Sequence, residues 1–570
     1  MEPTNVPDLS PGDRVLLEQQ GVLTPAQSKT VLWCAFDVPE GLECLSVFLD
    51  YRPRWSRDPE RNERLITRAV DRQLQQAAGD GVALPLDVRQ QVLARLRPQC
   101  SGLRNLLNLV LVSPSGEHRG RWDLEQHGAP APDLVASTWA TPGYVPGPIS
   151  PGTWSAALEV HEVIGDSCDY HLRLAGLTRA PEPLPARAHR SCPAPVREYG
   201  HPVPEGWLRG ELHCHSRASD GLFDTTTLVE RARELGLDFV ALTDHNVAVR
   251  LKDIDRLPLT VIPGCEITTF RGHFLAYGVS EAPAWYERER LVEPRELAAF
   301  VRARGGLFGL AHPFVLGDPI CVGCRLGVDV DPDELDVLEV WSRGAEEIVA
   351  VRHALRLFDR LCRQGHRVVA VAGRDWHGPA HEQGTAGRRF PATVVRSRAD
   401  RSALLQALRQ GACYLSVGPV VDLRLQGATR TAGLGQRLGI DVDEAGGGQE
   451  VTAQIRVDNL EEPACLRLLC AGEVVRIERV PAGPFRREYP GIRPRRGGVR
   501  LELWGEDLAE PLVITNRIEF RGFIPRAVAT SRSAPAGARG RAADSSRSTP
   551  SGVRGPARAR RPAGARGTEF

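Results

Sequence analysis

Nine His, Asp and Glu residues recur where short apolar runs of the chain end or begin. His213 and His215 form an HxH pair, and Asp375 and His377 form a DxH pair. Because successive side chains of a strand alternate between its two faces, the members of each pair point the same way. Imidazole and carboxylate groups suit Zn²⁺, Mn²⁺ or Fe²⁺. The candidate metal ligands are His213, His215, Asp220, His245, Glu266, His273, His312, Asp375 and His377.

The number of these groups predicts more than one cation. A mononuclear site needs three or four ligands, so nine indicate two or three divalent metals with shared ligands. A single His at a strand end is more often a packing residue, but six of the 15 His of the chain fall at such places in one segment. Many hydrolase barrels of another kind, the amidohydrolases, also begin with an HxH pair but bridge two metals with a carboxylated lysine. Lys29 and Lys252 are the only lysines and neither ends a predicted strand, so Glu266 is the better bridging candidate.

The elements that must position these ligands lie between about residues 207 and 418. Apolar runs such as LDFVALT and VVAVAGR alternate there with amphipathic stretches such as TTTLVERARELG, which Gly236 would cap. Strands that alternate with helices over about 210 residues predict a parallel sheet, and this length suits a closed α/β barrel. In such a barrel the carboxyl ends of the strands form one face, where sites are built.

The flanking segments predict further units. Residues 1–29 are polar and predict a loose arm, and short β-rich runs predict a β-sandwich over 30–178 with a helical insertion near 56–98. A Pro-rich linker follows over 179–204, before the barrel at 205–419. Further β-rich sequence covers 420–525, and the Arg, Ala, Gly and Pro tail of 526–570 predicts disorder.

Composition excludes several classes of protein. The net charge is +1, but the tail from Arg526 carries ten Arg, which leaves a mildly acidic body. A dedicated nucleic-acid binder is therefore not expected, apart from weak contacts of the tail. No apolar run reaches the roughly 18–20 residues of a membrane span, and no signal peptide is evident. The 13 Cys show no regular framework, which favours buried thiols and a cytoplasmic location.

One CxxC motif, Cys321 to Cys324, follows His312 closely, so its loop is expected to overhang the metal cleft. A single pair cannot fill a tetrahedral Zn²⁺ site. We therefore interpret the pair as reduced, inert thiols. A small structural metal or a redox role is the alternative.

At this point the chain resembles a known family. The motifs ELHCHSRASDG, ALTDHN, PGCEIT, GHFLAYG, AHPF and GRDWHG occur in order over about 207–418. They resemble the PHP (polymerase and histidinol phosphatase) superfamily and, within it, the CehA/McbA-like metallohydrolases. The N-terminal β domain looks like the accessory module found before some of these barrels. The resemblance implies a distorted (β/α)7 barrel with a three-metal cleft.

The resemblance also implies how the ligands divide. His213, His215, Glu266 and Asp375 would hold the first metal. Glu266 would bridge to the second, together with His273 and His312. The third metal would take Asp220, His245 and His377. Arg374 departs from the family pattern, which has a small residue before the Asp, and we expect its side chain to point away from the metals.

Such a centre predicts a metal-dependent hydrolase. Two cations can hold a bridging hydroxide that attacks phosphorus, so no side chain is needed as nucleophile. Arg217 and Arg343 are candidates for binding a substrate phosphate, and Asp244 either orients a ligand or serves a turn.

We expect a phosphoesterase that acts on a small phosphorylated molecule. The first alternative is hydrolysis of a carboxyl ester or carbamate at the same site. The second is a non-catalytic protein that binds a partner through its β-sandwich. The sequence leaves open which of these holds, and leaves the oligomeric state open too.

Overall fold

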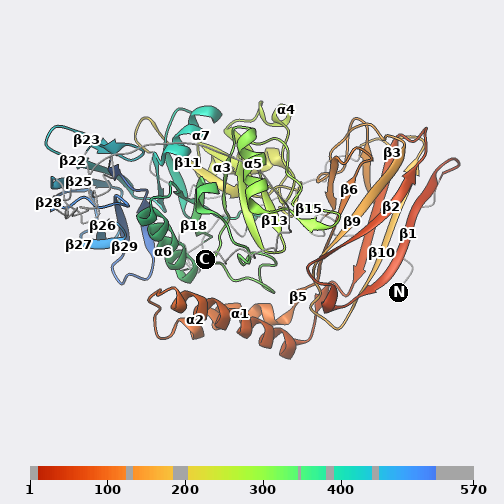
Figure 1. Ribbon diagram of the computed structural model, residues 1–570, viewed down its shortest axis with the longest axis horizontal. Coiled ribbons are helices and arrows are strands. Elements are labelled where there is room, and N and C mark those ends of the chain that lie inside the picture. Colours follow the sequence, from red (N-terminus) through yellow and green to blue (C-terminus); the bar gives the residue numbers. More distant parts are fainter. Residues whose placement is uncertain are drawn as a thin grey trace, which may run out of the picture.

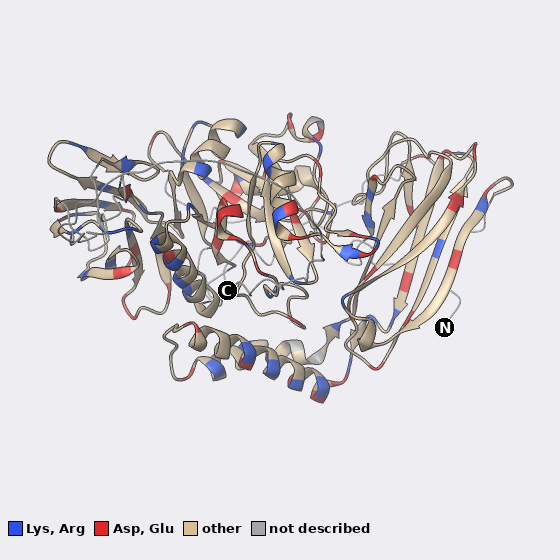
Figure 2. Ribbon diagram, viewed as in Figure 1, with Lys and Arg blue, Asp and Glu red and all other residues tan. Residues whose placement is uncertain are grey.

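The computed structural model describes residues 10–122, 132–183, 203–343, 348–379, 390–439 and 449–520. A β-rich N-terminal part, a central α/β part and a β-rich C-terminal part follow one another along its long axis (Figure 1). Residues of both charge signs occur along the helices and strands (Figure 2). Most of the expected linker and all of the expected disordered tail lie outside the described residues. No helix of the described ranges is long and apolar enough to cross a membrane.

The N-terminal part consists of two four-stranded antiparallel sheets that share a core. One sheet has the order β1-β10-β3-β8 and the other β2-β9-β6-β7. Trp154, Leu158 and Leu172 are among the buried residues of that core. The strands are β1 (Arg14–Leu23), β2 (Thr30–Val38), β3 (Cys44–Arg52), β6 (Leu106–Val112), β7 (His118–Trp122), β8 (Asp133–Ala136), β9 (Gly152–Glu162) and β10 (Cys168–Leu177).

The expectation of a loose arm over residues 1–29 is wrong for its second half. β1 pairs along its whole length with β10, from Arg14 opposite Gly176 to Leu23 opposite Cys168. Half of its residues are Val or Leu, but they do not alternate regularly, and of them only Leu23 is buried. Backbone pairing at the edge of the sheet, rather than an apolar pattern, thus orders this segment.

The helical insertion leaves the β-sheets and packs beneath the central part (Figure 1). It consists of α1 (Pro59–Gly79) and α2 (Val88–Leu96), flanked by the short strands β4 (Trp55–Ser56) and β5 (Leu103–Arg104). Gln73 of α1 donates to the carbonyl of Phe314, 2.8 Å away. At the end of the helix, Asp80 lies 2.6 Å from the ring of His353 in α6 (Ile348–Gln364). The insertion therefore supports the loop that follows His312.

The central part holds the strands and helices on which the ligand motifs lie. Its strands are β11 (Trp207–Cys214), β12 (Phe239–Leu242), β13 (Thr260–Thr269), β14 (Gly272–Tyr277), β17 (Leu307–Leu310), β18 (Val337–Ser342), β19 (Val369–Gly373), β20 (Ala392–Arg396) and β21 (Cys413–Ser416). Its further helices are α3 (Thr225–Leu235), α4 (Leu251–Ile254), α5 (Pro294–Ala303) and α7 (Arg401–Gln410), and β15 (Tyr286–Glu287) pairs with β16 (Arg290–Leu291). Gly236 caps α3 with φ 91°, as predicted.

The central sheet departs from the expected alternation of parallel strands and helices in two places. β20 is antiparallel to both β11 and β21, and the second departure lies beside the ligands. β13 and β14 form an antiparallel hairpin, and β14 is also antiparallel to β17. Only Phe270 and Arg271 join the two strands, whereas a parallel crossover needs a dozen or more residues. Because β14 runs backwards, its first residues lie beside the carboxyl ends of the parallel strands. This places His273 at the same rim as the other candidate ligands.

The curled sheet meets itself along a seam between β19 and β11. Trp376 donates to the carbonyl of His213 at 3.0 Å, and His215 donates to the carbonyl of Trp376 at 2.8 Å. Deeper in the seam, side chains form the hydrogen bonds to the backbone of β19 that a neighbouring strand would otherwise form. Thr393 bonds the amide and carbonyl of Ala372, and buried Asn516 does the same for Ala370.

The C-terminal strands continue the central sheet. In the 13-stranded sheet, β21 is followed by β30 (Pro511–Thr515), β29 (Val499–Gly505), β26 (Ala464–Cys470) and β27 (Glu473–Val480). A second sheet packs on them and contains β23 (Thr431–Gly433), β22 (Val420–Gln426), β25 (Val451–Asp458) and β28 (Phe485–Ile492). β24 (Arg437–Leu438) pairs with β31 (Glu519–Phe520). The C-terminal part therefore helps to complete the central fold and supplies Asn516.

The seam predicts a stability effect. Replacing Asn516 by Leu leaves the amide and carbonyl of Ala370 buried without partners, and each such group costs about 1–3 kcal/mol. We expect Asn516→Leu to lower the free energy of unfolding by about 2–4 kcal/mol in urea denaturation. The exposed Thr431→Val in β23 is the control and should change it by less than about 0.5 kcal/mol. Equal stability of the two variants would contradict this account of the seam.

Candidate metal centre

All nine predicted ligands lie together at one rim of the central sheet. β11 supplies His213 and is followed by His215 and Asp220. His245 follows β12, Glu266 lies in β13 and His273 lies in β14. His312 follows β17, and Asp375 and His377 follow β19. Seven of the nine are buried. The side chain of His245 is 13% exposed and that of His377 is 25% exposed.

Glu266 lies at the centre of the group, and its two carboxylate oxygens face different neighbours. Oε2 lies 3.3 Å from Nε2 of His213 and 3.6 Å from Nε2 of His215. Oε1 lies 3.0 Å from Nδ1 of His273 and 3.1 Å from Nε2 of His312. Two ligand atoms on one tetrahedral cation at about 2.0–2.2 Å are themselves about 3.4 Å apart. The spacing around Glu266 therefore fits two cations bridged by one carboxylate.

Asp375 completes the group around His213. Its Oδ1 lies 3.1 Å from Nε2 of His215 and 3.5 Å from Nε2 of His213. These four side chains are the set that the resemblance implies for a first metal. His245 also approaches this group, with its Nδ1 2.8 Å from Oε2 of Glu266.

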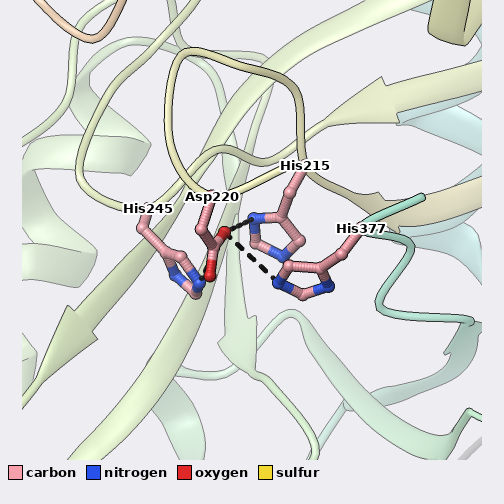
Figure 3. A group of neighbouring side chains, drawn as sticks. All are labelled: His215, Asp220, His245 and His377. Carbon is pink, nitrogen blue, oxygen red and sulfur yellow. Dashed lines mark ion pairs between the residues drawn. The ribbon is translucent and has the colours of Figure 1, made fainter. Parts of the chain in front are cut away.

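A further group surrounds Asp220, as Figure 3 shows, with three imidazole rings turned toward one carboxylate. Oδ1 of Asp220 lies 3.3 Å from His377, 3.4 Å from His245 and 3.9 Å from His215. The four ligand atoms are within 4.8 Å of one another. His215 thus faces two groups, through Nε2 and through Nδ1, so the centre is continuous.

Buried atoms without hydrogen-bond partners indicate that the protein alone does not satisfy this centre. Three ligand atoms are in this state: Nε2 of His213, Oδ1 of Asp220 and Oε2 of Glu266. Most buried polar side-chain atoms of native proteins have a partner, because an orphaned one is costly. Divalent cations would satisfy Oε2 of Glu266, Nε2 of His213 and Oδ1 of Asp220 at once.

The electrostatics match this interpretation. Burial raises the pKa of Asp375, but Arg343 and His377 lower it by more, so the carboxylate is ionised at neutral pH. Burial lowers the pKa of His215 to about 3, and His377 and His245 act in the same direction. His215 is therefore a neutral imidazole, the form that binds metals.

The backbone at the rim is strained. Asn246, His312, Arg343 and Asp375 have φ angles of 54°, 25°, 57° and 53°, in the left-handed region that L-residues rarely adopt. Each of the four lies just after the strand that leads to it. Such strain persists where the surroundings impose it and gathers at functional sites.

Sequence reasoning missed Glu339, which orients two of the ligands. It is buried in β18, 3.1 Å from Nδ1 of His213, and accepts from the amide of His312 at 2.9 Å. A carboxylate that holds the far nitrogen of a metal-binding imidazole fixes the ring and raises its basicity. Gly373 makes room, because a Cβ there would lie 2.7 Å from Oε1 of Glu339. The available signal was a charged residue inside the apolar run LDVLEVW.

Asp244 positions a loop. Its carboxylate accepts from the amide and hydroxyl of Ser216 at 2.7 and 2.8 Å, and from the hydroxyl of Ser219 at 2.8 Å. This fixes the turn that presents Asp220. The turn role that the sequence left open is therefore the one observed, and it acts on a ligand indirectly.

The three arginines singled out in the sequence differ in their surroundings. Arg343 donates to Oδ2 of Asp375 at 2.6 Å, so it lies at the centre. Arg217 donates to the carbonyl of Leu222 at 3.0 Å, within its own loop. Arg374 is fully buried and pairs with Glu211 at 2.8 Å, away from the ligand groups, as expected.

The interpretation of Cys321 and Cys324 as reduced thiols is wrong for this structure, in which they form a disulfide. Their Cα atoms lie 5.4 Å apart, within the range that a disulfide can span. Their loop does lie over the centre, because Sγ of Cys324 is 3.7 Å from Nδ1 of His273.

The comparison with protein families agrees with the motifs. Residues 211–408 match the PHP domain. This range contains all nine candidate ligands, Glu339, the end of β11 and the strands from β12 to β20. The match supports the PHP superfamily resemblance of the central part. Placement among the CehA/McbA-like members stays a prediction.

The curated relatives of the chain are short matches or distant ones. An uncharacterized protein of Methanocaldococcus jannaschii is 26% identical over 153 residues, which are 24% of this chain and 84% of that protein. A 5'-3' exoribonuclease of Salmonella typhimurium is 43% identical over 65 residues, 10% of this chain. The chain spans only 22% of the length of that exoribonuclease.

A crystal structure from Bacteroides vulgatus is also similar. It is described as a two-domain protein containing a predicted PHP-like metal-dependent phosphoesterase. It is 16% identical with a TM-score of 0.33, and the match covers 59% of this chain and all of that one.

The contact between Glu339 and His213 predicts a loss of metal affinity. Glu339→Gln keeps an acceptor for the amide of His312 but removes the charge beside His213. We expect Zn²⁺ or Mn²⁺ affinity to fall about 10–100-fold while the circular dichroism spectrum stays unchanged. Competition with a chromogenic chelator measures the affinity. The exposed Glu234→Gln is the matched control. Unchanged affinity in Glu339→Gln would refute the assigned role.

Proposed function

We propose that this protein is a metal-dependent hydrolase that cleaves a phosphoester bond of a small phosphorylated molecule. The observation that carries the proposal is the carboxylate of Glu266, whose two oxygens face separate groups of imidazoles at ligand spacing. A site built this way suits two adjacent divalent cations, and the group around Asp220 suits a third. Zn²⁺, Mn²⁺ and Fe²⁺ all accept such imidazole and carboxylate ligands.

The side chains of the centre would both coordinate the cations and balance their charge. Glu266, Asp375 and Asp220 supply negative charge in a buried place, and the imidazoles complete the coordination. Bound divalent cations lower the pKa of water and neutralise charge on a phosphoryl group during in-line displacement. The hydroxyls of Ser216 and Ser219 donate to Asp244, so they hold the loop rather than attack substrate.

Arg343 is the better of the two candidates for contact with a substrate phosphate. It lies beside Asp375 at the rim, and its side chain is 28% exposed. A guanidinium in that place neutralises Asp375 and adds positive charge at the rim, where a phosphate would bind. Arg217 is directed to its own loop instead.

Phosphorus rather than carbon is the favoured reaction centre. The exoribonuclease of Salmonella typhimurium, to which part of the chain is similar, is named for phosphoester cleavage. The N-terminal β part, proposed as an accessory domain, packs on the centre. Its buried Arg121 donates to the carbonyl of His245 at 3.0 Å, which argues against a binding module independent of the site.

A substrate comparison tests the proposal. Protein loaded with Mn²⁺ or Zn²⁺ is given p-nitrophenyl phosphate, bis-p-nitrophenyl phosphate and p-nitrophenyl acetate, and p-nitrophenol release is followed. We expect turnover of a phosphate ester that falls at least about 100-fold in His213→Ala, because that change removes a ligand beside Glu266 and Asp375.

His366→Ala is the matched control. This His lies before β19, at the opposite end of that strand from the centre, where it pairs with Asp333. It should retain activity. Turnover of the acetate alone, lost in His213→Ala, would replace the proposal with a carbon-ester hydrolase. Absence of turnover for every ester by metal-loaded protein would contradict hydrolysis altogether.

A further inference from the structure

The disulfide-bonded loop places a sulfur atom beside one of the ligand groups. Cys324 is fully buried, and its Sγ lies 3.7 Å from Nδ1 of His273. Ligand atoms of His273, His312 and Cys324 are all within 4.8 Å of one another. Glu266 faces the same two imidazoles through Oε1 at 3.0 and 3.1 Å. Four potential ligands therefore surround one position.

The spacing is that of ligands on a shared cation. A tetrahedral Zn²⁺ with Zn–S of about 2.3 Å and Zn–N of about 2.0–2.1 Å separates the sulfur and nitrogen atoms by about 3.6 Å. The observed separation of Sγ and Nδ1 is 3.7 Å. One Cys, two His and one Glu would form a closed four-ligand set, whereas Glu266, His273 and His312 alone leave one position open.

The bonding state of Cys324 decides whether its sulfur can bind a cation. In this structure its sulfur is bonded to Cys321, and a disulfide sulfur lacks the thiolate charge that binds a metal. Cys321 is partly exposed, whereas Cys324 is buried. A dithiol reductant can therefore attack Sγ of Cys321 and expel Cys324 as the thiolate. The second thiol of the reductant then releases Cys321. The reductant becomes a disulfide, and Cys321 and Cys324 together gain two electrons and two protons.

The loop is held near the ligands by contacts other than the disulfide. The amide of Gly323 donates to Asp318 at 2.7 Å, and Lys29 of the N-terminal part pairs with the same carboxylate at 3.0 Å. Gly323 has φ 83°, and a Cβ there would lie 2.4 Å from the carbonyl oxygen of Thr269 in β13. Gln73 of α1 bonds the start of the loop at Phe314. These contacts keep Cys324 beside His273 after reduction.

We propose that Cys324 is a redox-gated ligand of the cation held by Glu266, His273 and His312. In the disulfide state the cation keeps an open position, and reduction supplies a thiolate that fills it. On ligation Cys324 releases its proton. The proposal rests on the metal centre of the proposed function and adds to it a thiol-sensitive control of one position.

Cobalt spectroscopy tests the proposal without relying on activity. Full-length protein is loaded with Co²⁺ in the disulfide state, which alkylation and mass spectrometry verify, and then treated with a dithiol. We expect visible d–d bands in both states and a near-ultraviolet sulfur-to-cobalt charge-transfer band only after reduction. Cys321→Ser, which leaves Cys324 unable to pair with it, should show that band without reductant. Cys324→Ser should never show it.

The outcomes separate this proposal from the proposed function. Visible Co²⁺ bands with no charge-transfer band in reduced wild type and in Cys321→Ser would overturn the thiolate ligand but leave the metal centre standing. A charge-transfer band that persists in Cys324→Ser would assign the sulfur elsewhere and overturn it too. Failure to form the Cys321–Cys324 disulfide under oxidation would overturn the gating. Absence of any Co²⁺ binding would contradict the metal centre itself.

Discussion

The buried carboxylate of Glu266 sets the main constraint on this protein. An ionised carboxylate removed from water is costly unless positive charge and hydrogen bonds surround it. Burial raises the pKa of Glu266, but His213, His273 and His245 lower it by more, so the group stays charged. The protein must therefore hold several imidazoles around one point, and divalent cations between them would supply the remaining charge.

The fold provides this convergence through one reversed strand and one seam that side chains close. The β13–β14 hairpin reverses one strand and thereby brings His273 to the rim formed by the carboxyl ends of its neighbours. The seam between β19 and β11 is closed by side chains, with Asn516 contributed by the C-terminal part. The N-terminal part supports the rim from outside through Arg121 and the α1 insertion. All three parts of the chain thus contribute to one site.

Much of the site could be predicted because its signal is local. The HxH and DxH pairs follow apolar runs, and alternation along a strand sends both members of each pair to one side. Glu339 was missed because its role depends on β18 lying between β17 and β19, with Gly373 of β19 leaving room for it to reach His213 of β11. No spacing along the chain reveals that arrangement. The pairing of β1 was missed for a similar reason, since the apolar residues of this edge strand are mostly exposed or half-exposed and do not alternate regularly. The disulfide of Cys321 and Cys324 could not be foreseen, because the motif alone does not fix the bonding state of the thiols.

The most direct test of the metal centre is anomalous X-ray diffraction from crystals of the protein grown with Mn²⁺ or Zn²⁺. The account predicts one anomalous peak near each oxygen of Glu266, at about 2.0–2.2 Å, and a third near Oδ1 of Asp220. A cleft without anomalous peaks, in crystals that bind the same ion elsewhere on the surface, would contradict the account. In that case the nine side chains would have to be interpreted as a buried hydrogen-bonded network rather than as ligands.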